Sequence, residues 1–395
     1  STQSHQCFNV PHLRFPEFSG EWEKCTLGGI GTTFNGLTGK SANDFGSGSP
    51  FITYKSIFDS SKIDISKVEY VRISETERAK QTQNEVEYGD TFFTTSSETP
   101  EEVGMASVLL TPIHDCYLNS FCFGYRLFDK QAYLPDFFRF YLRSNNVRRK
   151  IAILAQGSTR FNISKNEVMK MSIFLPSQNE QRKISEFFSL IEERIETQRK
   201  IIEDLKKLKD AISFILFTSE TCDKWELSNL ATIVMGQSPS SQCYNTDNDG
   251  LPLIQGNLDI TKGKLTPHLY SSEMTKKCHT GDVILTVRAP VGEVAIADFD
   301  ACIGRGVCAI RPFNNNYSVL IYQFLQHYKP KWISLEQGST FTSVSRNDIM
   351  SIKIGVPSIQ AIEILNILDD KISIEDVILN NLNSQKNYLL AQMFI

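Results

Sequence analysis

Several residue groups in this sequence could do chemistry, but each lacks part of the set that its reaction needs. Gly39-Lys40-Ser41 resembles the end of a phosphate-binding loop, yet that loop requires glycine where the sequence has Phe34. The paired acids Glu101-Glu102 and Glu192-Glu193 are typical of solvated faces. The histidines occur singly, at His5, His12, His114, His268, His279 and His327. The sequence therefore predicts neither a catalytic residue nor a metal site.

The motifs of common enzyme classes are also missing. There is no Asn-Pro-Pro-aromatic or Asp-Pro-Pro-aromatic tetrapeptide, which amino-methyltransferases use to hold a flipped base. There is no G-x-S-x-G elbow and no H-E-x-x-H helix. We therefore expect a binding protein rather than an enzyme.

Composition and cysteine usage favour a globular protein in a reducing compartment. The charge is -4, from 41 basic and 45 acidic residues, so any basic groove must be offset by acidic surfaces elsewhere. The nine cysteines include no C-x-x-C pair, which predicts free thiols rather than disulfides or zinc. No apolar run is long enough to span a membrane, and the first ten residues are polar. We expect a cytoplasmic protein.

The polar loops of the chain belong to a long internal sequence repeat. Residues Gly157–Met169 align without a gap on Gly338–Met350, at an offset of 181 residues. Gly, Ser, Thr, Ser, Asn and Met recur identically, and Lys165 is matched by Arg346. Each half opens alike, with Trp-Glu followed by a glycine-containing stretch. This pattern predicts a duplicated chain with pseudo-two-fold symmetry.

Each repeat is followed by a segment with the pattern of a long helix. Pro176-Ser177 and Pro357-Ser358 precede these segments, and the serines are plausible N-caps. Apolar residues then recur at alternating steps near three and four, as in a coiled-coil seam. In the first segment they are Ile184, Phe188, Ile191, Ile195, Ile202, Leu205, Ile212 and Ile215. In the second they are Leu365, Leu368, Ile372, Leu379, Leu382, Leu389 and Met393.

Two such helices favour packing on one another as an antiparallel coiled coil, although each could instead be a helix of its own domain. The rest of each half alternates short β-rich runs with Gly, Asn, Asp and Pro. Strands are expected within 50–54, 91–95, 281–287 and 307–311, and helices over 134–154 and 317–335. The fold class is therefore α+β, with two pseudo-symmetric, sheet-rich domains separated by two long antiparallel helices.

This layout resembles the specificity subunit of type I restriction–modification systems. Val10-Pro-His-Leu-Arg-Phe-Pro-Glu-Phe-Ser-Gly-Glu-Trp22 is similar to the start of one subgroup, and Pro176-Ser-Gln-Asn-Glu-Gln-Arg-Lys-Ile184 to the family's entry into its first spacer helix. The second half resembles one class of target-recognition domain in Met235-Gly-Gln-Ser-Pro-Ser240, Gly281–Gly292 and Cys302-Ile-Gly-Arg-Gly306. The first half and the second helix entry depart from these patterns.

The resemblance implies a domain order along the chain. A tail would cover 1–20, the first target-recognition domain 21–176, the central spacer helix 177–218, the second target-recognition domain 219–356 and the second spacer helix 357–395.

The resemblance also implies a mechanism with several partners. Each target-recognition domain would read one half of a bipartite double-stranded DNA target, and the helices would set the gap. Two methyltransferase subunits would dock on the helices, and restriction/translocase subunits would join them. The chain itself would need no cofactor, because S-adenosylmethionine and ATP would bind the partners. The residues expected to hold the partners are Ile184, Phe188, Ile191, Ile195, Leu368, Ile372 and Leu379.

Candidate DNA contacts follow from the chemistry of base and phosphate recognition. Arg and Lys suit guanine, Asn and Gln suit adenine, and small hydroxyls suit phosphates. In the first half we select Lys40, Lys55, Thr159, Arg160, Asn162, Ser164 and Lys165. In the second half we select Gln237, Ser238, Ser240, Gln255, Asn257, Arg288, Arg305, Thr340, Thr342, Ser345 and Arg346. The repeated Gly-Ser-Thr loop fits either a shared phosphate contact or a shared structural turn.

Three other functions stay open at this point. The chain could be an enzyme with unrecognised motifs, a coiled-coil scaffold without DNA affinity, or a decoy subunit that binds partners but reads nothing. The sequence does not identify the bases recognised or the length of the spacer.

Overall fold

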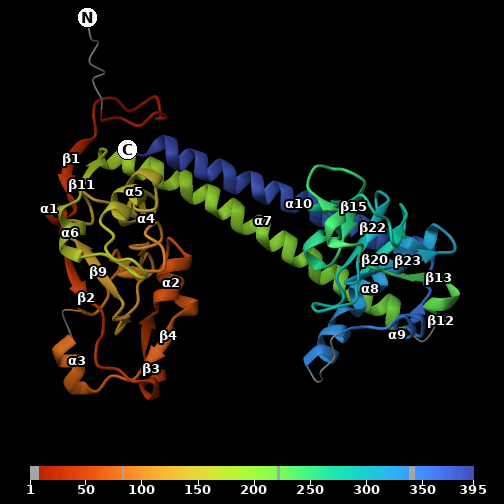
Figure 1. Cartoon of the computed structure of the whole chain (residues 1–395). Helices are drawn as coiled ribbons and strands as arrows, with labels where there is room; N and C mark the ends of the chain where they lie inside the picture. Colours follow the sequence, from red (N-terminus) through yellow and green to blue (C-terminus); the bar gives the residue numbers. More distant parts are fainter. Residues whose placement is uncertain (1–8, 82–83, 220–222, 338–342) are drawn as a thin grey trace, which may run out of the picture. The chain divides into compact units, whose positions relative to one another are not determined.

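The computed structural model describes residues 9–81, 84–219, 223–337 and 343–395. The chain divides into two compact units, one formed by Ser1–Thr197 with Leu379–Ile395, the other by Gln198–Ile378 (Figure 1). Both boundaries fall inside long helices, so each unit contains part of each helix.

The first unit is built on a four-stranded antiparallel sheet in the order β2-β9-β5-β7. A second sheet has the order β4-β3-β8, in which β3 and β8 run parallel. Two short ribbons, β1–β11 and β6–β10, complete the strands. The strands are β1 (Glu23–Thr26), β2 (Gly31–Asn35), β3 (Phe45–Ile52), β4 (Glu69–Val71), β5 (Thr91–Thr94), β6 (Ser96–Ser97), β7 (Ala106–Val108), β8 (Tyr117–Leu118), β9 (Cys122–Leu127), β10 (Phe161–Asn162) and β11 (Ser172–Leu175).

The second unit repeats this topology. Its four-stranded antiparallel sheet has the order β13-β23-β20-β21, and its second sheet, β14-β18-β15-β22-β19, again contains one parallel pair, β15 with β22. Two ribbons, β12–β24 and β16–β17, accompany them. The strands are β12 (Lys224–Glu226), β13 (Ala231–Met235), β14 (Tyr244–Asn245), β15 (Leu251–Ile254), β16 (Ile260–Thr261), β17 (Lys264–Leu265), β18 (Leu269–Ser271), β19 (Lys277–Cys278), β20 (Val283–Thr286), β21 (Val294–Ile296), β22 (Ala301–Ile303), β23 (Val307–Pro312) and β24 (Lys353–Gly355).

The repeat read from the sequence is thus a repeat of strand order as well as of residues. A buried ion pair is duplicated with it: Arg126 binds Asp90 in the first unit, and Arg311 binds Asp282 in the second. The arginines lie on the equivalent strands β9 and β23 of the two four-stranded sheets. The aspartates directly precede the equivalent strands β5 and β20. The α+β fold class with two similar sheet-rich halves is confirmed.

Short helices cover the sheets. They are α1 (Leu27–Ile30), α2 (Tyr54–Asp59), α3 (Glu75–Gln81), α4 (Pro135–Tyr141), α5 (Asn145–Ile153), α6 (Lys165–Lys170), α8 (Asn316–Gln337) and α9 (Arg346–Met350). Single 3₁₀ turns cover Ala42–Asp44, Ile65–Lys67, Leu227–Asn229, Ser241–Cys243 and Asn257–Asp259.

The single helix expected over 134–154 is wrong, because the chain breaks between α4 and α5. At the break, the Arg143 guanidinium donates to the carbonyl oxygens of Ile57 (2.6 Å), Ser60 (2.7 Å) and Ala106 (2.6 Å). These contacts to distant segments override local helix propensity. The counterpart in the second unit, α8, is one helix despite an internal Pro330.

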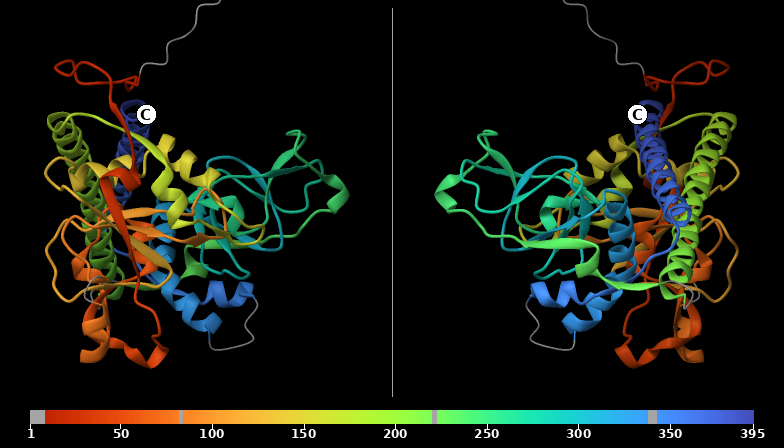
Figure 2. Two further views of the ribbon diagram at one scale, coloured as in Figure 1. Left: turned by 90° about the vertical axis from the view of Figure 1, so that its left-hand side faces the viewer. Right: turned by 90° about the vertical axis from the view of Figure 1, so that its right-hand side faces the viewer.

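The two long helices are α7 (Gln178–Thr218) and α10 (Ile359–Met393). In the first unit the start of α7 packs on the end of α10, where the Phe188 ring lies 5.6 Å from that of Phe394, beyond the helix end (Figures 1 and 2). In the second unit the rest of α7 packs on the start of α10, and Lys209 pairs with Asp369 at 2.6 Å. Within each unit the two segments run antiparallel, as the seam pattern predicts.

One residue of the predicted seam is misplaced. Ile215 is 65% exposed, and Phe217 is buried against the second unit's core instead. A straight α-helix has 3.6 residues per turn, so a seam extrapolated at 3.5 drifts off the contact face over several heptads. The other seam residues are buried or half-buried.

Within the described ranges, no helix is both long and apolar enough to cross a membrane. The seven cysteines in those ranges are free thiols.

Candidate nucleic-acid interface

In each half, the same backbone crossing forms at one end of the four-stranded sheet, which we call the main sheet. The segment that follows the first strand (β2 or β13) crosses the loop that leads into its neighbour (β9 or β23), and we call this crossing the junction. Leu37 N donates to Leu118 O (2.7 Å) in the first half, and Gln237 N donates to Ile303 O (2.9 Å) in the second. The junction is therefore a duplicated structural feature, held by equivalent backbone bonds.

A glycine makes this close approach possible in both halves. A Cβ on Gly36 would lie 2.0 Å from the carbonyl oxygen of Asn119, and a Cβ on Gly236 would lie 2.0 Å from that of Gly304. No side chain fits at such a distance, so the turn depends on glycine at both positions.

The residues that follow the repeated Gly-Ser-Thr motif, 162–163 and 343–344, run across this junction. Ile163 N donates to Thr95 O (3.0 Å), and Val344 N donates to Val287 O (2.9 Å). Asn162 pairs with Ser96 on β6, and Ser343 forms the matching bridge with Arg288. These described residues therefore occupy the same place in each half, next to the end of β5 in the first and of β20 in the second.

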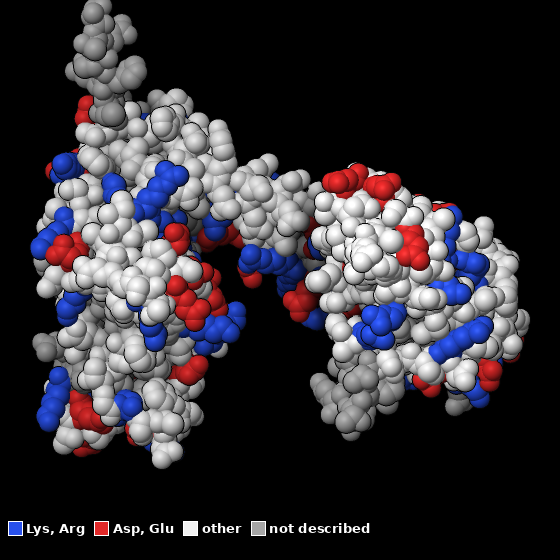
Figure 3. All heavy atoms as spheres, in the orientation of Figure 1, with Lys and Arg blue, Asp and Glu red and all other residues white. Residues whose placement is uncertain are grey.

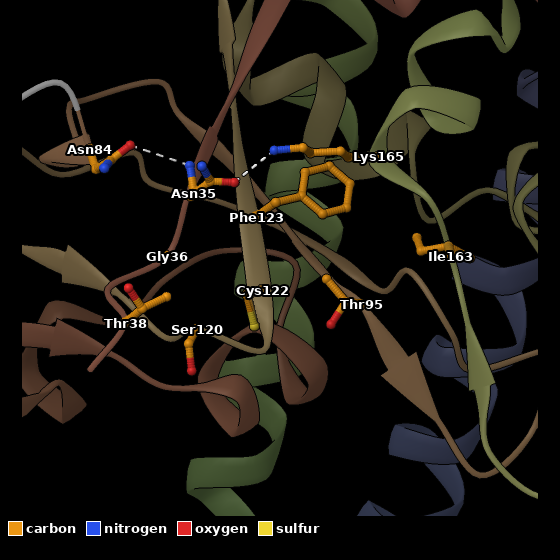
Figure 4. Close-up of a pocket in the computed structure, with 10 residues that line it drawn as sticks. All are labelled: Asn35, Gly36, Thr38, Asn84, Thr95, Ser120, Cys122, Phe123, Ile163 and Lys165. Atoms are coloured by element: carbon orange, nitrogen blue, oxygen red, sulfur yellow. Dashed lines mark hydrogen bonds between the residues drawn. The ribbon is translucent and has the colours of Figure 1, made fainter. Parts of the chain in front are cut away.

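Two cavities open at the junction of the first half. One of about 390 Å³ is lined by Asn35, Gly36, Thr38, Asn84, Thr95, Ser120, Cys122, Phe123, Ile163 and Lys165 (Figure 4). The other, of about 730 Å³, is lined by Tyr54, Phe58, Ser96, Ser97, Glu98, Glu102, Thr159 and Arg160. Both cavities are lined largely by hydrogen-bonding side chains, which suits recognition of a polar ligand.

Hydrogen bonds orient the side chains of the first cavity. Lys165 Nζ donates to Asn35 Oδ1 at 2.7 Å, and Asn35 N donates to Asn84 Oδ1 at 3.3 Å (Figure 4). Burial raises the pKa of the Cys122 thiol to about 12, so this cysteine is neutral and unsuited to nucleophilic attack. In the second cavity, Tyr54 Oη donates to Ser96 O (2.7 Å), and burial raises the pKa of its phenol.

The structure gathers most of the predicted residues of the first half. Thr159 and Arg160 line the larger cavity, and Lys165 lines the smaller one. Asn162 and Ser164 lie between them, on β10 and at the start of α6, and Lys55 is exposed on α2.

Lys40 lies apart from this group. Its side chain is 8% exposed, lines neither cavity and pairs with Glu77 at 2.7 Å. Its charge is therefore already neutralised within the chain.

In the second half, four predicted residues meet at the junction. Arg305 N donates to Ser238 Oγ (3.1 Å), and Gln255 Nε2 donates to Tyr244 Oη (2.9 Å). Thr275 Oγ1 donates to the carbonyl oxygen of Gln237. Backbone bonds from Gly304 N to Ile254 O (2.8 Å) and from Gln237 N to Ile303 O (2.9 Å) join these segments, so Gln237, Ser238, Gln255 and Arg305 lie together.

The other predicted residues of the second half surround this group or lie outside it. Ser240 and Asn257 are exposed on flanking turns. Ser345 caps α9, since its hydroxyl accepts from Asp348 N at 3.3 Å, whereas the matching Ser164 makes no such bond at the start of α6. Thr340 and Thr342 lie outside the described residues.

Three exposed arginines belong to the second junction, and two of them, Arg288 and Arg305, replace serines of the first. Arg288, Arg305 and Arg346 are exposed, and none forms an ion pair with any residue that the structure describes. On the face of this unit drawn in Figure 3, several acidic side chains gather along the upper edge and basic side chains spread below them. Unpaired guanidinium groups on a pinned loop are well suited to bases and phosphates.

Sequence reasoning missed several side chains of the first junction, above all Asn35, Asn84 and Ser120. The only sequence signal was the glycine that follows Asn35, because a glycine at a strand end marks a close approach or a turn. Nothing local to Asn84 or Ser120 indicates that they share a cavity.

The residues expected to hold partner subunits are buried to different degrees within the chain itself. Ile184 and Phe188 belong to the first unit's core, and Ile195 is 4% exposed. Ile191, Leu368, Ile372 and Leu379 are half-buried in the same helix contacts. The three buried side chains are covered by the chain itself, whereas the four half-buried ones keep part of their surface exposed, so the expectation that they hold partners stays a prediction. Within the described residues no cluster of His, Cys, Asp or Glu could hold a metal ion.

Comparison with known proteins agrees with this geometry. The family model for the type I restriction modification DNA specificity domain matches twice, over residues 19–207 and 220–384. A putative type I restriction enzyme MjaX specificity subunit from Methanocaldococcus jannaschii is 30% identical over 381 residues, covering 89% of this chain and 87% of that protein.

Solved structures share the fold over nearly the whole chain. One is described as showing complex assembly and conformational transition of the type I R-M system; it has a TM-score of 0.62 and 22% identity, with 97% of this chain and 99% of that chain covered. The S subunit of a type I restriction-modification system from M. genitalium has a TM-score of 0.61 and 16% identity, with 98% and 99% covered.

The chain therefore belongs to the type I restriction–modification DNA specificity family. Members of this family are non-catalytic specificity subunits, and the function of the chain is DNA sequence specificity.

Proposed function

We propose that each junction reads one half of a bipartite DNA target, and that the long helices set the number of base pairs between the halves. The observation that carries this proposal is the duplicated junction, which presents hydrogen-bonding side chains from equivalent positions of both halves. Phosphate contacts from Lys165 and Arg346 would fix the position on the duplex, while Asn35, Arg288 and Arg305 would contact base edges.

Two methyltransferase subunits dock on the outward helix faces in this proposal, and restriction/translocase subunits complete the assembly. The outward face of α10 in the second unit supports it, because Ile364, Ile367 and Ile374 are 49%, 65% and 55% exposed. Such a row suits an apolar helix of a partner. S-adenosylmethionine and ATP are held by those partners, the chain needs no cofactor, and the complex acts in the cytoplasm.

Mapping of genomic N6-methyladenine in cells that carry this chain and its modification subunit tests the proposal. We expect one asymmetric motif of two short blocks separated by a fixed gap. Inserting one helical turn into both α7 and α10 should change the gap and leave both blocks unchanged. A continuous motif, or an unchanged motif after deletion of the chain, would contradict the proposal.

Gel-shift titration separates this function from those of a scaffold and a decoy. The chain alone should bind random duplex weakly and in a salt-sensitive manner, and the modification subunit should sharpen binding to the mapped motif. An Ile367→Glu/Ile374→Glu variant should lose co-purification with the modification subunit. Glu363→Gln, at an exposed position of the same helix, is the matched control.

A further inference from the structure

An exposed phenylalanine lies at the centre of the first junction. Phe121 is 59% exposed, although its backbone is tightly held. Thr95 N and Thr95 Oγ1 both donate to Phe121 O, at 3.0 and 2.8 Å, and Phe121 N donates to Asn119 Oδ1 at 2.8 Å. The ring is thus presented to solvent from a rigid loop, so binding through it requires little ordering of the backbone.

The surroundings of Phe121 are polar rather than apolar. Its chain neighbours, Ser120 and Cys122, line the smaller cavity together with Asn35 and Lys165 (Figure 4). Single exposed apolar residues are common on protein surfaces and need no explanation by themselves. Phe121 differs because it lies between two lining residues of the candidate DNA site, a cavity that Lys165, a residue suited to phosphate, also lines.

The second half cannot carry an equivalent ring. Val287 N donates to Gly306 O (2.9 Å), just as Thr95 N donates to Phe121 O, so Gly306 is the counterpart of Phe121. A Cβ on Gly306 would lie 2.0 Å from the carbonyl oxygen of Gln255. Its neighbour is Arg305, where the first half has Ser120. The first junction thus presents an aromatic ring where the second has glycine, and the second presents a guanidinium group one residue earlier, where the first has serine.

We propose that Phe121 is a specificity-determining residue that packs against the base pairs of the half-site read by the first unit and partly unstacks one base step. Apolar side chains inserted between bases are a known way to bind and bend DNA. Flexible pyrimidine–purine steps open most easily, so the ring favours a half-site that contains such a step. This inference rests on the proposed function, because it assumes that the first junction reads DNA.

The chain offers a matched control on the same strand. Phe128 follows the other end of β9, is 67% exposed and lines neither cavity. Replacing either ring by alanine removes the same exposed apolar group. If Phe121→Ala weakens DNA binding and Phe128→Ala does not, the loss therefore identifies a contact made by Phe121 and not a general effect of surface hydrophobicity.

The test uses the full chain in complex with its modification subunit. The probe is a duplex that carries the motif mapped from genomic N6-methyladenine, with 2-aminopurine placed at successive positions of each block. With the wild-type complex and with Phe128→Ala, we expect 2-aminopurine fluorescence to rise at one step of one block. With Phe121→Ala, we expect no rise and at least about 10-fold weaker binding, the size of one lost base–aromatic contact. Phe121→Trp should restore much of both signals.

The outcomes separate failure of this inference from failure of the proposed function. If Phe121→Ala matches Phe128→Ala in affinity and fluorescence, the proposed role of Phe121 is wrong while DNA reading stands. The same holds if Phe121→Ala loses the modification subunit rather than DNA, because the ring then contacts protein. If the wild-type complex does not prefer the mapped motif, both proposals fall. Thermal melting of the two alanine variants checks that both fold.

Discussion

The two junctions share one backbone arrangement but differ in side-chain chemistry. Where the first half has Ser96 and Ser120, the second has Arg288 and Arg305, at positions matched by the same backbone pairings. The larger cavity of the first half also includes two glutamates, Glu98 and Glu102. The difference teaches that the duplicated frame and the recognition chemistry vary independently, so two halves of one chain can read different sequences.

The two halves also share an ion pair whose carboxylate is buried. Its removal should cause the largest loss of unfolding free energy among these predictions. Arg126 binds Asp90 through two bonds of 2.8 and 2.6 Å, and the Asp90 side chain is 0% exposed. Arg126→Ala leaves this carboxylate buried without its partner, which costs about 3–5 kcal/mol of unfolding free energy. Arg311→Ala should cost less, because the Arg311 side chain is 37% exposed against 23% for Arg126. Denaturant unfolding with hydrogen exchange measures the loss in each unit.

The pH dependence of the Arg126→Ala variant provides its control. Burial raises the pKa of Asp90, and Arg126 opposes that shift. Without Arg126 the folded state binds the proton more tightly than the unfolded state does, so stability increases as pH falls. The loss of unfolding free energy in Arg126→Ala, relative to the wild type, should therefore be largest at neutral pH and become smaller in acid. A deficit that grows in acid would show that Asp90 is not the affected group.

The second prediction tests whether the two frames are equivalent. Gly36→Ala and Gly236→Ala each force a methyl group against a backbone oxygen at 2.0 Å, and we expect each to destabilise its unit by about 3 kcal/mol. Gly256→Ala is the control, because a Cβ there has no atom within 4 Å. Unequal losses at the two glycines, measured by denaturant unfolding, would argue against a common frame.

The third prediction tests the difference in recognition chemistry. Arg288→Ala and Arg305→Ala should each weaken binding to the mapped motif by about 1–3 kcal/mol and relax only one of its two blocks. Ser96→Ala and Ser120→Ala should change affinity much less. Competition gel shifts and methylome mapping measure both effects, and Lys353→Ala, an exposed lysine on β24, is the control for charge. Relaxation of both blocks by one arginine would contradict separate reading by the two halves.

The smallest loss of DNA affinity is expected at the matched positions where both halves carry a basic side chain. Lys165 and Arg346 occupy matched positions of the repeated loop, and both are suited to phosphate. Alanine at either position should weaken binding to all sequences alike and reduce the slope of affinity against salt by about one. A sequence-dependent loss at one position would make that residue a base reader.

Much of the fold could be predicted because it repeats local patterns. The alternation of β-rich runs with turns predicts the main-sheet strands near 91–95, 281–287 and 307–311, and heptad spacing predicts the long helices. The single helix expected over 134–154 was wrong because contacts with distant segments determine where the helix ends. There, Arg143 donates to carbonyl oxygens far away in the sequence. Ile215 was misplaced because a small error in helical period accumulates along the helix.

Less of the site could be predicted. The repeated loop directed attention to Arg160 and Lys165, and flexible glycines to Arg305. Asn35, Ser120 and Phe121 were missed, because they join the site only through the return of the chain between β8 and β9. Lys40 was chosen for its charge, which Glu77 neutralises.

The sequence by itself determined that the chain is duplicated, that its halves are sheet-rich and that two long amphipathic helices follow them, because these features depend on periods and matches along the chain. The tertiary arrangement was needed to show which side chains meet at each junction, which helix residues are already covered, and that Phe121 faces solvent in one half where the other half has Gly306. Such proximity depends on pairings between segments tens of residues apart, such as β3 with β8, and no local pattern encodes the distance between their side chains.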